Sequence, residues 1–180
     1  MLNTFLLIAL ALAIVIAAIF AVASMRPDTF AIQRSAGIKA PPERLFALIN
    51  DLKAMSTWNP YSLRETTGTG TVDYSGPASG KGAKSTFAGP KSGTGSIEIV
   101  DAAAPSKVTM RLLMTAPFKA DNTVEFTLKP DGAQTTVTWA MSGKQPLLAK
   151  AMTLFIDCDK MVGKDFEEGL ANLKALAGKP

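Results

Sequence analysis

The sequence contains no histidine and only one cysteine, and these absences exclude several kinds of site. Without histidine, the chain lacks the commonest general base and the commonest metal ligand of proteins. With Cys158 alone, it can form no intrachain disulfide bond, and it has too few cysteine and histidine ligands for a structural zinc site. We therefore expect no metal, no cofactor and no complete catalytic site, although a lone cysteine does not decide the redox compartment.

Charged residues are absent from the first 25 positions. The apolar run from Phe5 to Ala23 would measure about 28 Å as a helix, close to the hydrocarbon thickness of a bilayer. Ala21-Val22-Ala23 has the pattern of a signal-peptidase site, but no positive residue precedes the run, and the run is longer than the apolar core of a typical signal peptide. We predict a retained transmembrane anchor at residues 1–25, followed by one domain at residues 26–180.

The basic residues suggest an orientation but no nucleic-acid partner. Arg26, Arg34, Lys39 and Arg44 follow the apolar run and none precedes it, so the positive-inside rule places the domain on the cytoplasmic side of a bacterial-type inner membrane. The flank is weakly charged, so the inverted orientation stays open. The net charge of +4 is spread along the chain without a basic run, which is not typical of a nucleic-acid binder. Lys81, Lys84 and Lys91 lie in a glycine-rich stretch that we interpret as a solvated loop.

Residues 26–146 show the pattern of an antiparallel meander. Turn-like segments, such as Ala104-Pro105-Ser106 and Pro130-Asp131-Gly132, separate short stretches of strand-like sequence. A short helix is predicted at 42–49, and a second one begins at Asp51 and runs to about Trp58, where Asn59-Pro60 breaks the chain. Seven strands are predicted, at 29–38, 69–74, 84–88, 94–101, 107–115, 122–130 and 134–142.

The C-terminal segment from Leu147 to Ala177 is predicted to be one long amphipathic helix that ends at Gly178. Such a helix must bury its apolar stripe, and a strongly curved antiparallel sheet can wrap around it. Where the two surfaces diverge, they leave an apolar cavity. The order of one strand, two helices, six strands and one helix thus predicts an α+β container.

Several segments resemble, in the same order, the START-like superfamily (SRPBCC). The resemblance is to its polyketide cyclase/dehydrase and lipid-transport group in particular, and it spans residues 29–176. It is carried by Ser35–Asp51, Trp58-Asn59-Pro60-Tyr61, Gly80-x-Gly82-Ala83, Gly93-x-Gly95, Thr136-x-Thr138-Trp139 and Val162–Lys174. It implies the helix-grip fold, a curved antiparallel sheet around a C-terminal helix. Members of the group bind lipids, quinone-like molecules, hormones or polyketides, and only some are enzymes, so the fold alone assigns no reaction.

Apolar and aromatic residues on the inward strand faces and on the last helix are the candidates for a cavity lining. Each of them is also a candidate for ordinary core packing, and the Trp58–Tyr61 element has the same two interpretations, a cavity mouth or a structural plug. The candidate set is Trp58, Tyr61, Met110, Met114, Phe126, Trp139, Met141, Met152 and Phe155.

Polar residues of the domain are interpreted as structural. Strand alternation places Arg111 and Glu125 on the outer face of the sheet. Asp157 and Asp165 are interpreted as surface charges of the last helix, and Cys158, which has no histidine to activate it, as an inert thiol. No catalytic residue is therefore predicted.

Three functions remain open. The first is a membrane-tethered module that binds a lipid, an isoprenoid or another hydrophobic small molecule in an apolar cavity. The second is an accessory subunit of a larger membrane protein complex, docked through the alanine-rich apolar helix. The third, a cyclase- or dehydratase-like enzyme, is the least favoured, because the sequence shows no convergent polar set.

Overall fold

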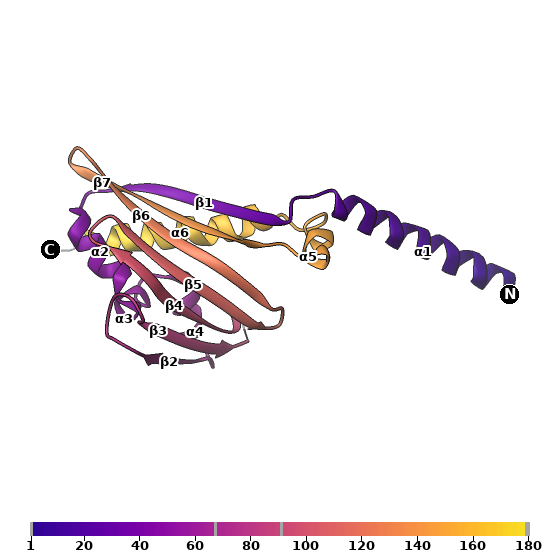
Figure 1. The fold of residues 1–180 in the computed structure, drawn as a ribbon, viewed down its shortest axis with the longest axis horizontal. Helices are drawn as coiled ribbons and strands as arrows, with labels where there is room; N and C mark the ends of the chain where they lie inside the picture. Colours follow the sequence, from indigo (N-terminus) through magenta and orange to yellow (C-terminus); the bar gives the residue numbers. More distant parts are fainter. Residues whose placement is uncertain (1, 67, 91, 179–180) are drawn as a thin grey trace.

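The computed structural model describes residues 2–66, 68–90 and 92–178. Figure 1 shows a curved sheet with a long helix on its concave side, and a separate helix that projects from one end of this domain. The helices are α1 (Leu2–Ser24), α2 (Pro42–Asn50), α3 (Leu52–Met55), α4 (Pro60–Thr66), α5 (Leu147–Met152) and α6 (Cys158–Ala177). The strands are β1 (Thr29–Ile38), β2 (Thr71–Ser75), β3 (Lys84–Gly89), β4 (Gly93–Ala103), β5 (Lys107–Ala116), β6 (Ala120–Asp131) and β7 (Gln134–Lys144).

The seven strands form one antiparallel sheet in the order β1-β7-β6-β5-β4-β3-β2, which confirms the predicted antiparallel meander. β2 to β7 follow one another as a meander, and β1 joins the sheet beside β7. Tight turns make this order possible: Gly132, for example, adopts a positive φ of 60° in the turn between β6 and β7.

The projecting helix α1 is exposed over nearly its whole length. The segment Asn3–Ser24 is long and apolar enough to cross a membrane, a property that anchors and signal sequences share. Its last turn contacts α5, and Ala23 is fully buried there. The N-terminal helix predicted from the sequence is therefore present.

The prediction of one continuous helix from Leu147 to Ala177 is wrong. α5 ends at Met152, a turn follows, and α6 starts at Cys158. Asp157 explains the new start, because its carboxylate accepts a hydrogen bond of 3.0 Å from the Lys160 backbone N–H and so caps α6. Asp157 is exposed, as predicted, and it caps α6 instead of lying within a helix, while Gly178 ends α6 as predicted.

The break predicted at Asn59-Pro60 is followed by a helix that the prediction omitted. Pro60 occupies the first position of α4, where a missing N–H costs nothing. The Asn59 carboxamide accepts a hydrogen bond of 3.0 Å from the Tyr61 N–H at the same helix start. The predicted cap at Asp51 is confirmed, since its carboxylate accepts hydrogen bonds from the N–H groups of Lys53 and Ala54.

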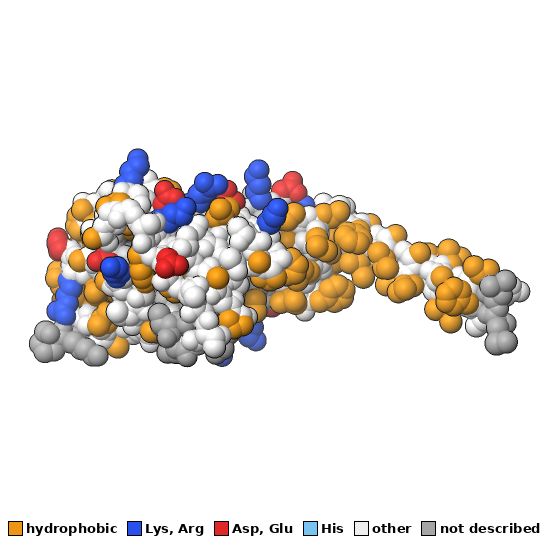
Figure 2. Space-filling view, turned by 90° about the horizontal axis from the view of Figure 1, so that it is seen from below, with side chains coloured by type: hydrophobic (Ala, Val, Ile, Leu, Met, Phe, Trp, Pro, Cys, Tyr) orange, Lys and Arg blue, Asp and Glu red, His pale blue; other side chains and the backbone are white. Residues whose placement is uncertain are grey.

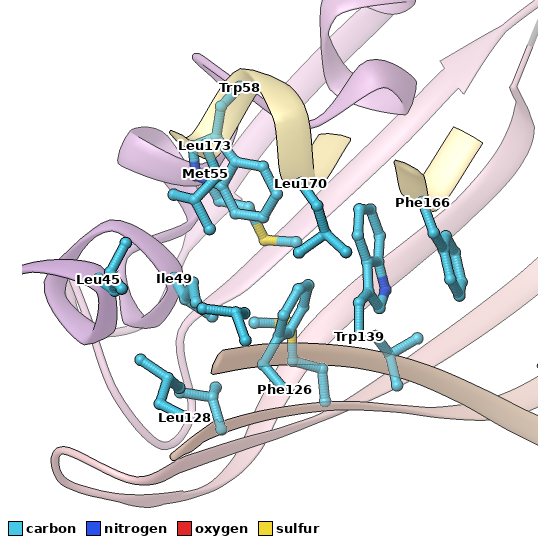
Figure 3. Packing of buried hydrophobic residues seen from close by; sticks show 14 of the residues in the cluster. Leu45, Ile49, Met55, Trp58, Phe126, Leu128, Trp139, Phe166, Leu170 and Leu173 are labelled. Atoms are coloured by element: carbon cyan, nitrogen blue, oxygen red, sulfur yellow. The ribbon is translucent and has the colours of Figure 1, made fainter. Parts of the chain in front are cut away.

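The core lies between the sheet and helices α2, α3 and α6 (Figure 3). α6 packs against β1 and β7, while α2 packs against β5, β6 and α6. Gly169 allows α6 to approach the sheet closely, because a Cβ at this position would lie 2.6 Å from Cζ3 of Trp139. The fully buried large side chains include Leu45, Ile49, Trp58, Met110, Phe126, Leu128, Phe166, Leu170 and Leu173.

Candidate ligand cavity

A cavity of about 290 Å³ lies beside this core, between the concave face of the sheet and helices α3, α4 and α6. Side chains of six strands line it, from β2 to β7. Its lining consists of Leu52, Met55, Asn59, Tyr61, Ser62, Val72, Tyr74, Ser85, Phe87, Ser92, Ile97, Leu112, Met114, Asn122, Val124, Trp139, Met141 and Phe166. Tyr74 of the edge strand β2 is also exposed, so the lining extends to the surface of the domain at that edge.

Strand alternation explains why these residues face the cavity. On β5, Leu112 and Met114 point inward, while Arg111 and Leu113, which alternate with them along the strand, are exposed on the outer face. Asp121 holds the Arg111 guanidinium there, with Oδ2 and Nη2 2.6 Å apart. Glu125 pairs with Lys107 at 2.6 Å in a similar way. The prediction that Arg111 and Glu125 lie on the outer face is therefore confirmed.

Four aromatic rings separate the cavity from the solid core. Trp58 meets Phe126 and Trp139 edge-to-face, each with a centroid distance of 5.9 Å, and Trp139 stacks on Phe166 at 4.2 Å (Figure 3). The Trp58 indole N–H donates to the carbonyl of Leu48 at 3.0 Å. Trp58 is fully buried, so it plugs the junction between α3 and the sheet, whereas Trp139 and Phe166 turn one side to the cavity.

The cavity is apolar, with a few polar groups at its surface. Among the described lining residues, none has an ionised side chain at neutral pH. Asn122 and Trp139 are both more than nine-tenths buried, and Oδ1 of Asn122 and Nε1 of Trp139 have no hydrogen-bond partner. A buried acceptor and a buried donor without partners each cost free energy, and both atoms are covered by the surrounding protein.

An ion-pair cluster lies next to the cavity at Tyr61. Arg64 of α4 forms two hydrogen bonds to Asp165 of α6, at 2.5 and 3.1 Å, and the Tyr61 hydroxyl also bonds to Asp165. The hydrogen bond from Arg64 holds the pKa of the Asp165 carboxyl below its ordinary value. Burial, together with the negative charge of Asp165, raises the pKa of Tyr61, so this phenol is neutral at physiological pH.

The interpretation of Asp165 as a surface charge is therefore wrong. Only 18% of its side chain is exposed, and its carboxylate joins α6 to α4. The sequence could not reveal this partner, because Arg64 is 101 residues away along the chain. Arg64 lies on α4, a helix that the sequence prediction omitted.

The nine predicted cavity residues divide into three groups in the structure. Four line the cavity: Tyr61, Met114, Trp139 and Met141. Three are buried in the core beside it, at 3% exposure or less, and are not part of the lining: Trp58, Met110 and Phe126. Met152 and Phe155 lie elsewhere, exposed on α5 and on the turn after it, because the break before α6 turns them away from the sheet.

Sequence reasoning missed the lining residues of α3, of the Asn59–Ser62 segment apart from Tyr61, and of β2 to β4. Leu52, Met55, Val72, Phe87 and Ile97 are the apolar members of this group. The lining also contains four residues of β5, β6 and α6 outside the nine candidates: Leu112, Asn122, Val124 and Phe166. Alternation in β3 and β4 was the available signal, because Phe87 and Ile97 each follow a two-residue period. The abundance of glycine and serine around them weakened that signal.

The described residues contain no group of acidic, cysteine or histidine side chains that could hold a metal ion. Cys158 is a free, partly buried thiol in the first turn of α6. Lys81 is exposed in the loop between β2 and β3, whereas Lys84 is the first residue of β3 and lies 3.9 Å from Glu98. Lys91 lies outside the described residues.

Sequence comparison identifies the domain that encloses this cavity. Residues 29–178 match the family described as polyketide cyclase/dehydrase and lipid transport. The chain belongs to this family. The match begins with β1 and ends at the residue after α6, so the matched region contains the whole sheet, the cavity and α6. Among curated proteins, no sequence matched the chain.

Solved structures show the same fold at low sequence identity. Major latex-like protein 151 of Panax ginseng superposes with a TM-score of 0.61 at 12% identity, covering 85% of this chain and 100% of its own. A Chromobacterium violaceum protein gives 0.59 at 16% identity, with coverages of 86% and 100%. The Aha1 dimer of Colwellia psychrerythraea gives 0.58 at 18% identity, with coverages of 82% and 96%. These likenesses confirm the predicted helix-grip fold and extend no further than the fold.

Proposed function

We propose that this protein is a membrane-tethered binding module that holds one hydrophobic small molecule in the cavity under its sheet. The observation that carries the proposal is the apolar cavity itself. The family to which the chain belongs supports it, because members of that family bind hydrophobic small molecules. A well-formed apolar pocket with a few polar groups is the usual form of a small-molecule site.

The size of the cavity indicates the kind of ligand. Its volume of about 290 Å³ is just below the range found for ligand pockets, about 300–1,000 Å³. A single acyl or isoprenoid chain, or one small ring system, suits this volume better than a lipid with two long chains. Met55, Met114 and Met141 support the proposal, because flexible thioether side chains adapt to ligands of irregular shape.

The polar atoms of the lining favour a ligand with one polar group. The hydroxyl groups of Ser62 and Ser85 are part of the lining, and each can donate a hydrogen bond to a carbonyl or accept one from a hydroxyl of the ligand. An amphiphile with a hydroxyl or carbonyl head and an apolar body therefore fits the described lining.

The helix α1 supports the tether. It is apolar, exposed, and long enough to cross a bilayer. If it is retained, it keeps the cavity close to a reservoir of hydrophobic molecules, which raises their effective concentration at the site. The Lys and Arg residues that follow α1 support a cytoplasmic position for the domain.

Mass spectrometry tests the proposal most directly. The full-length protein would be purified from its native membrane in mild detergent and weighed intact, before and after denaturation. We expect a defined small molecule at close to one copy per chain, released on denaturation. Preparations that contain no such molecule but include a constant set of membrane proteins would contradict the proposal and favour the accessory-subunit function.

The accessory-subunit alternative has one observation in its favour. Ala9, Ala11, Ala13, Ala17 and Ala18 are exposed small residues of α1, and small residues permit close contact between membrane helices. An enzymatic function is less well supported. The described lining has no carboxylate or imidazole that could transfer protons, and the neutral Tyr61 phenol is already bonded to Asp165.

A further inference from the structure

Large apolar side chains gather on the surface where α1 joins the domain (Figure 2). They come from the residue after α1, from α5, from the turn that follows α5, and from the first turn of α6. We call this group the apolar collar. It consists of Met25, Leu147, Leu148, Met152, Phe155, Ile156 and Met161, which are between 38% and 87% exposed.

The collar is held firmly against the end of α1. Lys150 of α5, whose side chain is 6% exposed, forms an ion pair with Asp28 just after α1. The Asp28 carbonyl accepts a hydrogen bond of 2.7 Å from the Gln145 N–H, and Arg26 donates one of 3.4 Å to the Thr153 carbonyl. α5 therefore has a fixed position relative to α1.

This position sets the depth of the collar in a membrane. The apolar segment Asn3–Ser24 would measure about 33 Å as a helix, slightly more than the hydrocarbon core of about 30 Å. If α1 spans the bilayer, its last turn lies at the edge of this core. Ala23, in that turn, is buried where α1 contacts α5, so α5 lies at the level of the headgroups.

The composition of the collar suits that level. Interfacial segments place apolar side chains into the boundary between headgroups and acyl chains, and they surround them with basic residues. Arg26, Lys144 and Lys160 are exposed around the collar. The acidic residues there are engaged within the protein: Asp157 caps α6, Asp28 pairs with Lys150 and Asp159 pairs with Arg34. An aqueous location would leave Phe155, at 75% exposure, and its apolar neighbours in water.

We propose that the apolar collar is a docking surface for the bilayer that α1 crosses, with Leu148, Phe155 and Ile156 inserted below the headgroups. This inference rests on the membrane tether of the proposed function. Docking fixes the orientation of the domain, because only residues 25–28 separate α1 from β1. The cavity then has a constant position above the membrane.

Depth-dependent quenching tests the inference in the full-length protein. The protein would be reconstituted in vesicles of phosphatidylcholine and phosphatidylglycerol that contain spin-labelled lipids. In a Cys158→Ser background, a polarity-sensitive fluorophore is attached at Phe155→Cys, with Ile14→Cys in α1 and Lys129→Cys near the β6–β7 turn as references. We expect the label at 155 to be quenched about threefold more strongly than the label at 129, with a blue-shifted emission.

A pair of substitutions separates insertion from general proximity. Ile156→Asp places a charge within the collar, and Leu113→Asp places the same charge on the exposed outer face of β5. Ile156→Asp should reduce quenching at 155 by at least about half, because a charged group is disfavoured among acyl chains. Leu113→Asp should leave this quenching unchanged.

Two results would overturn the inference, and they differ in what they mean for the tether. Strong quenching at 14 with equally weak quenching at 155 and 129 would show an anchored domain held away from the bilayer. Weak quenching at all three positions would show that α1 does not span the bilayer, and the tether would fail together with the docking surface. Ligand binding is measured separately by mass, so neither result is confused with an empty cavity.

Discussion

The two ends of the space under the sheet differ in how completely they are filled. At one end, α2 lies between β5, β6 and α6, and its Leu45 and Ile49 are fully buried. At the other end, the short helix α4 contacts β2, β3 and α6, the four-residue helix α3 packs on α2, and the cavity remains there. The aromatic group of Trp58, Phe126, Trp139 and Phe166 lies between the two ends. The comparison shows that the cavity arises where no long helix fills the concave face.

Two methionines on one strand give the sharpest test of this difference. Met110 is fully buried in the core, while Met114, four residues later on the same face of β5, lines the cavity. Met110→Ala should reduce the free energy of unfolding by about 2–5 kcal/mol, because it opens a hole in a packed region. Met114→Ala should cost less than about 1 kcal/mol, since its side chain already borders empty space. Denaturant titration measures both values, and equal losses would contradict the division into packed and hollow ends.

The next-largest effect on stability is expected where α6 packs closely against the sheet. In Gly169→Ala, the new methyl group would lie 2.6 Å from Trp139 and 2.9 Å from Pro60, so the helix must shift. We expect a loss of about 1–3 kcal/mol in the free energy of unfolding, as found for overpacked sites. Near-ultraviolet circular dichroism of the tryptophans should change as well. An unchanged spectrum and unchanged stability would show that α6 does not approach Trp139 so closely.

The ion pair between Arg64 and Asp165 lies at the end of the sheet that contains the cavity, and it should make the free energy of unfolding depend on pH in the acid range. The pKa of Asp165 is lower in the folded chain than its ordinary value of 3.8. Its contribution to stability is therefore complete above that value and is lost as the pH falls through the folded pKa. Asp165→Asn should cost about 1–2 kcal/mol at pH 7 and much less near pH 3. The measurement is unfolding of both proteins at a series of pH values, and a pH-independent difference would contradict this explanation.

The smallest expected effect on stability comes from Asn122. Its Oδ1 atom is buried without a hydrogen-bond partner, so Asn122→Leu removes an unsatisfied group and breaks no strong bond. The free energy of unfolding should stay within about 1 kcal/mol of the wild type or rise slightly. A large loss of stability would show that Asn122 has a structural partner in solution.

The sequence predicted the fold better than it predicted the cavity. All seven strands appear near their predicted positions, because period-two alternation and turn residues are local signals. The helical spacing of apolar residues between Leu147 and Ala177 is also a local signal, but it continues across the break before Asp157. For this reason Met152 and Phe155 were predicted to line the cavity, whereas both are exposed. Trp58 and Tyr61 belong to one short motif, yet one ring is in the core and the other lines the cavity. The different environments of the two rings depend on how α4 packs on the sheet. This packing involves residues far apart in the chain, so no local sequence pattern predicts it.

The central claim, that the cavity under the sheet holds a hydrophobic molecule, is tested by filling it. Leu112 points into the cavity and Leu113, the next residue of β5, points outward, so Leu112→Trp and Leu113→Trp form a matched pair. Full-length wild type and both variants would be purified in the same detergent and weighed under native conditions. We predict that wild type and Leu113→Trp carry the same small molecule, while Leu112→Trp is folded and carries at least about tenfold less of it, because the indole occupies the ligand's space. Equal occupancy in the two variants would contradict the claim.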